Sequence, residues 1–346
     1  MADYQDLSKR ESQILHFTVQ NFIEQAAPVG SDKLVEMYNL SVSPATVRNV
    51  LHKLEKKGYL SQPHTSAGRI PTEHGYRYYV NSLVEMEPLS LYEHQAMDQI
   101  KNILNKDFDD AVFQAAQLLA RLSNMLALVV SPKLARGIFK KLDLISVSST
   151  RLLVVLTIKS GLVKTVNIEV EHELNRNQLD YVASILNERL SGYPMTEIAN
   201  KVNEMLADKR AEDTSGLIRI FIDSADTIFA ERPVNKFYYG GAEYIALLPE
   251  FRDENKYRQI LEMLENEDLV IHLMDQVTSN ENVSVHIGRE SKVQQIENCS
   301  VVSASYNIGE ITGKIGLVGP TRMKYGKMIS LVDQLVNRFN QTIYTP

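Results

Sequence analysis

The chain has 346 residues, a formal net charge of −6 at pH 7, and 44% hydrophobic and 23% charged residues. This apolar content can fill more than one core, and the length predicts two or three domains. The longest apolar runs, 125–130 and 152–158, are far shorter than the ~20 residues that span a bilayer, and the N-terminus lacks a signal peptide's apolar segment. Cys299 is the single cysteine, which excludes an internal disulfide and a cysteine zinc cluster, so we expect a cytoplasmic protein without membrane contact.

Residues 8–25 predict a first helix, because apolar side chains recur along one helical face. Ser8 and Glu11 stand at its start with the spacing of a capping box. The segment APVG at 27–30 ends this helix, and Ser31 can cap a short second one. The chain therefore begins with two helices joined by a tight connection.

A third helix is predicted from Ser43, with Pro44 in the first helical position and Gly58 as the terminating residue. One of its faces is apolar and can dock on its own domain, whereas the other is polar and basic. A strand, a turn and a returning strand follow, and Thr72 caps a fourth helix. Three short helices followed by a hairpin are the order of a winged helix-turn-helix.

The segment 41–80 is basic within an acidic chain. It holds six Lys or Arg residues against two acids, and three histidines in addition. Binding to phosphates depends on where positive charges lie, since counterions are released locally, so this segment is a candidate for DNA contact. Arg48 can pair with guanine and Asn49 with adenine in a major groove. The alternative is an ordinary amphipathic helix with a solvated face; the neighbouring helix and hairpin favour DNA binding.

Residues 63–80 match the wing and the helix after it. The small residues at the tip suit close approach to a DNA backbone, and Arg69 beside them can enter a minor groove or hold a phosphate. Tyr76 and Tyr79 are expected to pack inward, whereas Arg77 and Tyr78 lie off that face in positions compatible with exposure. The complete predicted DNA-binding set is Ser43, Thr46, Arg48, Asn49, His52, Lys53, Lys56, His64, Thr65, Ser66, Gly68 and Arg69.

Beyond a junction at 85–90, the pattern is helical to residue 129. Strand-like alternation at 140–170 and again at 282–319 is separated by a long helical stretch. Strands divided in this way often belong to one sheet with the helical part inserted, and we expect that arrangement here. A closing helix is predicted at 321–340.

Several blocks of the sequence resemble a known family. The block SVSPATVRNVLHKLEKKGYLSQPHTSAGRIPTEHGYRYYV, at 41–80, resembles the N-terminal signature of the HrcA family, the heat-inducible transcription repressors of bacteria. LLPEF at 247–251, VHIGRE at 285–290, CSVVSASY at 299–306 and GKIGLVGPTRMKY at 313–325 are similar to that family's other blocks. The resemblance covers essentially the whole chain and keeps the order of the blocks.

The resemblance implies an α+β multidomain fold. It implies a winged-helix DNA-binding domain at 1–88, a GAF-like α/β domain at 89–211 and 281–346, and a mostly helical dimerisation domain inserted at 212–280. It also implies a homodimer that binds an inverted-repeat operator of heat-shock chaperone operons, with the GroEL chaperonin as modulating partner. Two apolar stripes of the insert are candidates for the subunit interface, with an internal core as the alternative: Leu217, Ile220, Phe221, Ile260, Leu261 and Leu264.

Two other functions compete with this interpretation. The first is a small-molecule-sensing winged-helix regulator, in which Arg322 and Lys324 near a helix start hold an anion. The chain has no GxGxxG or GxxxxGK[ST], however, and a plain strand-turn-helix junction explains these residues. The second is an enzyme, but the histidines are scattered, Cys299 lacks a placed base, and His286 fits a core or edge position. We therefore predict no catalytic residue, no cofactor and no metal site.

Overall fold

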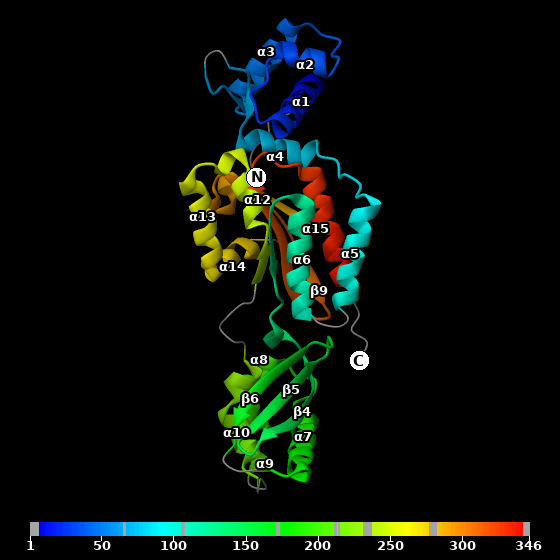
Figure 1. The fold of residues 1–346 in the computed structure, drawn as a ribbon, viewed down its shortest axis with the longest axis vertical. Coiled ribbons are helices and arrows are strands. Elements are labelled where there is room, and N and C mark those ends of the chain that lie inside the picture. Colours follow the sequence, from blue (N-terminus) through cyan, green and yellow to red (C-terminus); the bar gives the residue numbers. More distant parts are fainter. Residues whose placement is uncertain are drawn as a thin grey trace.

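The computed structural model describes residues 7–64, 67–104, 108–170, 174–210, 213, 215–230, 237–276 and 282–341. The chain forms three lobes along one long axis (Figure 1). The first helices form the N-terminal lobe, a five-stranded sheet with its helices forms the middle lobe, and a three-stranded sheet with its helices forms the distal lobe. None of the described helices combines the length and the apolar character that a bilayer crossing requires.

The N-terminal lobe follows the predicted order of elements. It contains α1 (Lys9–Gln25), α2 (Ser31–Met37), α3 (Pro44–Lys56), β1 (Leu60–Ser61), β2 (Ile70–Pro71) and α4 (Glu73–Ser82). The predicted capping box of Ser8 and Glu11 is confirmed. β1 pairs with β2 in antiparallel fashion, and a bridge between Val29 and Arg69 adds a third segment to the hairpin. The core of the lobe includes Leu15, Leu34, Leu54 and Tyr59.

The middle lobe is built on a sheet of order β7-β3-β10-β9-β8, in which every neighbouring pair is antiparallel. Its strands are β3 (Leu126–Val130), β7 (Phe237–Gly240), β8 (Ser284–Ile287), β9 (Cys299–Ile308) and β10 (Ile311–Pro320). Its helices are α5 (Leu91–Leu104), α6 (Phe108–Ser123), α12 (Ala242–Leu247), α13 (Glu254–Glu265), α14 (Glu267–Asp275) and α15 (Tyr325–Asn340). Short 3₁₀ turns lie at Leu134–Arg136, Pro249–Phe251, Gly288–Ser291 and Gln294–Ile296.

Helices cover both faces of this sheet. α5, α6 and α15 lie on one side and α12, α13 and α14 on the other (Figure 1). Along β3, alternate residues serve the two sides, because successive side chains of a strand point to opposite faces. Ala127 and Val129 join the core beneath α6 and α15, whereas Leu126 and Leu128 join the core beneath α13 and α14. All five residues of β3 are buried, which explains why this run is uniformly apolar.

The distal lobe is a three-stranded antiparallel sheet of order β4-β5-β6 packed against helices. Its elements are β4 (Phe139–Ser148), β5 (Arg151–Ile158), β6 (Val163–Glu169), α7 (Arg176–Leu190), α8 (Met195–Met205), α9 (Ala207–Arg210), α10 (Leu217–Asp223) and α11 (Ala225–Phe229). One face of β5, carrying Leu152, Val154, Leu156 and Ile158, is buried in the core with the helices.

The expectation that the segments 140–170 and 282–319 share one sheet is wrong, because they form two separate sheets. The predicted helical region also ends too late, since β3 occupies 126–130 and pairs with β10. The chain leaves the five-stranded sheet between β3 and β7, and it leaves again after β7 to form α12, α13 and α14 before it returns at β8. Period-two alternation identifies a strand and its buried side, but it contains no information on which strand lies beside which.

The two apolar stripes that were candidates for a subunit interface lie mostly inside the chain. Leu217 and Phe221 are fully buried within the distal lobe, and Ile260 and Leu264 are buried beneath the middle sheet. Ile220 is partly buried, and Leu261, at 37% exposure, is the most exposed of the six. Helical spacing marks a buried face, but a side chain packed in its own core cannot also contact a second subunit.

Glu11 ties the start of α1 to the end of α3. The Ser8 backbone N–H donates to Glu11 Oε2 at 2.9 Å, and Lys57 Nζ, at the C-cap of α3, lies 3.1 Å from Glu11 Oε1. The Ser8 N–H, assisted by Lys57, holds the pKa of the Glu11 carboxyl below its usual value although burial opposes this. The ionised carboxylate therefore stabilises the packing of α3 on α1.

Glu11→Gln should lower the free energy of unfolding by roughly 0.5–1 kcal/mol at neutral pH, because the amide keeps the bond to Ser8 but loses the ion pair. A carboxyl with a lowered folded-state pKa contributes stability above its ordinary pKa, and this contribution is lost as pH falls through the lowered value. Urea unfolding of both proteins should therefore show a difference that shrinks in acid. Glu24→Gln, at an exposed position of the same helix, is the control; a pH-independent difference would contradict the prediction.

Candidate nucleic-acid interface

The sequence at the start of α3 fixes where this helix begins. Ser43 is the N-cap, and its Oγ accepts the Thr46 backbone N–H at 3.2 Å. Pro44 follows in the first turn, where no intrahelical partner for its nitrogen is needed. The buried face is apolar and packs into the lobe's core through Val47, Val50, Leu51 and Leu54. Because this face is fixed, the opposite face must point outward.

The outward face of α3 is polar and basic. Arg48, Asn49, His52, Lys53 and Lys56 are all exposed. The Arg48 side chain is 73% exposed, and its nearest carboxylate, Asp32 on α2, is equally exposed and 3.8 Å away. A solvated pair at that distance is weak and leaves the guanidinium able to exchange partners. α3 lies at the end of the molecule farthest from the distal lobe (Figure 1).

The predicted wing is a short hairpin anchored to its own domain. Val29 and Arg69 exchange backbone hydrogen bonds of 3.1 Å and 2.9 Å. A Cβ on Gly68 would lie 2.3 Å from the Val29 carbonyl, so a glycine is needed here for the close contact within the lobe. His64 is exposed near the tip, and Thr65 and Ser66 lie outside the described residues.

Arg69, which was predicted to enter a minor groove or hold a phosphate, forms an ion pair within the lobe. Its side chain is only 17% exposed, and its Nη2 lies 2.9 Å from Glu55 Oε2 on α3. His52 Nδ1 lies 3.4 Å from the same carboxylate oxygen. Arg69 therefore joins the hairpin to α3, and Glu55 holds both the arginine and the histidine. Sequence reasoning missed Glu55, although its position as the single acid within the basic helix 44–56 was the available signal.

The inward tyrosines are confirmed, but Arg77 is not exposed. Tyr76 and Tyr79 are buried. The Arg77 side chain is 18% exposed and donates to Glu290 and to the Val285 carbonyl oxygen of the middle lobe. Helical position alone placed Arg77 off the lobe's own core, but it did not reveal that another lobe covers that side.

The sites considered for other functions have structural roles. Arg322 pairs with Glu250 and donates to the Ile23 carbonyl oxygen at 3.3 Å, so its guanidinium is already engaged at the start of α15. Burial raises the pKa of the Cys299 thiol to about 12, which disfavours a thiolate nucleophile. His286 lies on the edge strand β8. Within the described ranges, no group of three or more metal-ligating side chains comes together.

Comparison with known proteins identifies the family. The HrcA protein C-terminal domain matches residues 109–329. The heat-inducible transcription repressor HrcA of Chlorobium chlorochromatii is 39% identical over 345 residues, and the alignment covers 99% of both chains. This chain belongs to the HrcA family.

Further comparisons agree with the family assignment. The heat-inducible transcription repressor HrcA of Chlorobium phaeobacteroides (strain BS1) is 38% identical over 351 residues, covering 98% of this chain and 99% of that protein. A crystal structure at 2.2 Å resolution, described as that of a hypothetical protein, has a TM-score of 0.67 and 28% identity, covering 98% of this chain and 99% of that one. The family is one of transcription repressors and not of enzymes.

Salt dependence of DNA binding can separate the roles of Arg69 and Lys53. Lys53→Gln should reduce the slope of log affinity against log salt by about 1, because an exposed lysine releases one counterion on meeting a phosphate. Arg69→Gln should leave that slope unchanged, since Arg69 is paired with Glu55 inside the lobe. Titrations of a fluorescent duplex over a range of salt concentrations measure both. A reduced slope for Arg69→Gln would show that this arginine leaves Glu55 to contact DNA.

Proposed function

We propose that this protein is a DNA-binding transcription repressor of heat-shock chaperone operons, acting in the cytoplasm as a homodimer on an inverted-repeat operator. The observation that carries the proposal is the outward face of α3, where Arg48 and Asn49 are exposed on a helix held by its apolar side. Bidentate donors and acceptors of this kind read base edges in a major groove. The names of the curated relatives, heat-inducible transcription repressors, agree with this function.

The proposed domains follow the lobes. The N-terminal lobe is a winged helix, in which α3 is the recognition helix and the hairpin β1-β2 is the wing. The middle lobe is a GAF-like domain. The distal lobe, within the connection between β3 and β7, is the inserted dimerisation domain, in place of the segment 212–280. The antiparallel five-stranded sheet with helices on both sides supports the second assignment, and the separate sheet of the distal lobe supports the third.

A second copy of the chain is the proposed partner of the open face of the distal sheet. One face of β5 is buried against helices. The other face carries apolar residues that pair with exposed residues of the neighbouring strands β4 and β6. Ile145 pairs with Leu153, and Val163 pairs with Thr157, so these side chains share the outer face. Ile145 and Val163 are 49% and 51% exposed. An inverted repeat has two-fold symmetry, so its protein needs a two-fold contact, and this apolar face suits one.

The GroEL chaperonin is retained as the proposed modulator of repressor activity. Large apolar side chains exposed on the middle lobe, among them Leu91, Tyr92 and Leu247, are of the kind that a chaperonin binds. The competing function, a regulator that senses a small anion at the start of α15, is not favoured, because Arg322 is already paired there.

Footprinting on an inverted-repeat chaperone operator tests the function directly. Wild-type protein should protect both half-sites, and Arg48→Ala should weaken specific binding by about 10- to 100-fold, the usual range for one bidentate base contact. Arg219→Ala, at an exposed arginine of the distal lobe, is the matched control and should bind normally. Wild-type binding that does not prefer the operator over unrelated DNA would contradict the proposal.

The proposed subunit contact has its own test. Ile145→Glu and Val163→Glu should each convert the dimer into a monomer, because a carboxylate cannot be buried unpaired against a second apolar face. Leu247→Glu, at an exposed leucine of the middle lobe, should leave the dimer intact. Sedimentation equilibrium gives the mass in each case. A dimer that persists in both distal-lobe variants would place the interface elsewhere.

A further inference from the structure

The N-terminal lobe contacts the middle lobe through α4, its helix beside the middle lobe (Figure 1). Arg77 on α4 makes the central contact. Its Nε donates to Glu290 Oε1 at 3.0 Å, and its Nη2 donates to the Val285 carbonyl oxygen at 2.6 Å and to Glu290 Oε2. Arg77 therefore contacts both strand β8 and the 3₁₀ turn Gly288–Ser291 that follows it. A planar guanidinium with two separate acceptors fixes direction as well as distance.

Arg322 makes a second contact between the two lobes. It follows β10, pairs with Glu250 of the middle lobe, and donates from Nη1 to the Ile23 carbonyl oxygen at 3.3 Å. Ile23 lies in the last turn of α1, where carbonyl groups lack intrahelical partners and carry partial negative charge. The two arginines therefore hold two different helices of the N-terminal lobe, α4 and α1.

Two glycines of the middle lobe lie against the N-terminal lobe and the segment that follows it. A Cβ on Gly288 would lie 2.3 Å from Oε1 of the Glu73 side chain, at the start of α4. A Cβ on Gly326 would lie 2.2 Å from the Glu85 carbonyl oxygen, in the segment that follows α4. The Glu87 backbone N–H donates to the Gly326 carbonyl oxygen at 3.4 Å. Both ends of α4 are therefore in contact with the middle lobe.

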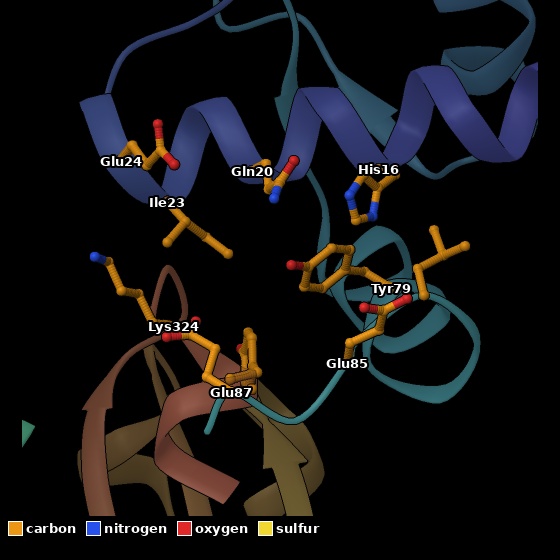
Figure 2. Close-up of a pocket in the computed structure, with 11 residues that line it drawn as sticks. His16, Gln20, Ile23, Glu24, Tyr79, Glu85, Glu87 and Lys324 are labelled. Atoms are coloured by element: carbon orange, nitrogen blue, oxygen red, sulfur yellow. The ribbon is translucent and has the colours of Figure 1, made fainter. Parts of the chain in front are cut away.

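The lobes also meet at Tyr76 and Tyr325, whose ring centroids are 6.1 Å apart, but a cavity leaves this packing incomplete. A cavity of about 350 Å³ separates α1 from the start of α15, lined among others by His16, Tyr79, Glu85 and Lys324 (Figure 2). Close by, the Tyr76 hydroxyl is buried and has no hydrogen-bond partner among the described residues. A junction with a cavity and an unsatisfied hydroxyl gains less from apolar packing than a core does. Arg77 and Arg322 add directional hydrogen bonds to this junction.

We infer that Arg77 is a positioning residue that sets the angle of the DNA-binding lobe and thereby the half-site spacing that the dimer accepts. The inference rests on the proposed function. α3 and the proposed subunit contact lie at opposite ends of an elongated chain (Figure 1), so a small rotation at α4 moves α3 far along the duplex. A two-fold dimer reads half-sites only at the separation of its two recognition helices.

The test is a panel of operators whose half-site spacing is lengthened or shortened one base pair at a time. Wild-type protein should prefer one spacing by about tenfold or more, the scale of a single misplaced base contact. Arg77→Gln should reduce that preference to less than about threefold, while affinity for an isolated half-site stays unchanged because α3 is untouched. Arg77→Lys keeps the charge and should restore part of the preference. Arg289→Gln, in the same 3₁₀ turn as Glu290, is the control.

A second measurement needs neither DNA nor a dimer. Spin labels at Lys33→Cys on α2 and Glu262→Cys on α13, both exposed, report the distance between the two lobes within one chain. Labelled chains diluted in unlabelled ones should give a narrow distribution in wild type and a broad one with Arg77→Gln.

The outcomes separate the two proposals. An absence of operator binding by wild type would contradict the proposed function, and the label distances would still test Arg77. Equal spacing preference in wild type and Arg77→Gln, or an unchanged distance distribution in the variant, would overturn the inference. If Arg77→Gln does not fold, as judged by circular dichroism, Glu290→Gln removes the same ion pair from the other side and carries the same expectations.

Discussion

The packing of the apolar side of α3 into the N-terminal lobe is the constraint on which the candidate interface depends. Val47, Val50, Leu51 and Leu54 occupy successive turns of one face, and their burial determines which residues remain outside. The hydrophobic effect is not directional, so polar contacts at the two ends of the helix fix its position. Ser43 caps the start, and Lys57 joins the end to Glu11 of α1.

The positive charge of the segment 41–80 is divided between two tasks. Lys57, Arg69 and Arg77 form ion pairs with carboxylates of the same chain, and each of these side chains is largely covered. Arg48, Lys53 and Lys56 are exposed on α3. The side chains of the first group hold the elements of the N-terminal lobe together and join that lobe to the middle lobe, since a desolvated ion pair with good geometry fixes the positions of its two partners. Those of the second group give the lobe its accessible positive face.

The interruption of the middle sheet explains the elongated shape. β3 and β7 are neighbours in the sheet, yet a whole lobe lies between them in sequence. An insertion between two adjacent strand ends leaves the parent sheet intact and projects the inserted lobe away from it, as Figure 1 shows. The α3 helix and the distal sheet consequently lie at opposite ends. The middle lobe, which contacts the N-terminal lobe through Arg77 and Arg322, is the only described connection between them.

The sequence by itself determined the features that depend on near neighbours in the chain. The helix starts at Ser8 and Ser43, the end of α3 just before Gly58, and the inward faces of α3 and α4 follow from capping and from a period of 3.6 residues. The composition of the outward face of α3 was determined in the same way, because a helix that buries one face must expose the other.

Only the tertiary structure decided the contacts between distant segments. β3 pairs with β7 and β10, which are far from it in sequence. Leu217 and Ile260 are buried in their own lobes, and Arg69 and Arg77 form ion pairs with Glu55 and Glu290. Alternation and helical spacing predict that a side chain is buried, but they do not predict which residues bury it. The sequence therefore predicted DNA contact for Arg69, beside a turn, but it did not reveal that Arg69 Nη2 lies 2.9 Å from Glu55 Oε2.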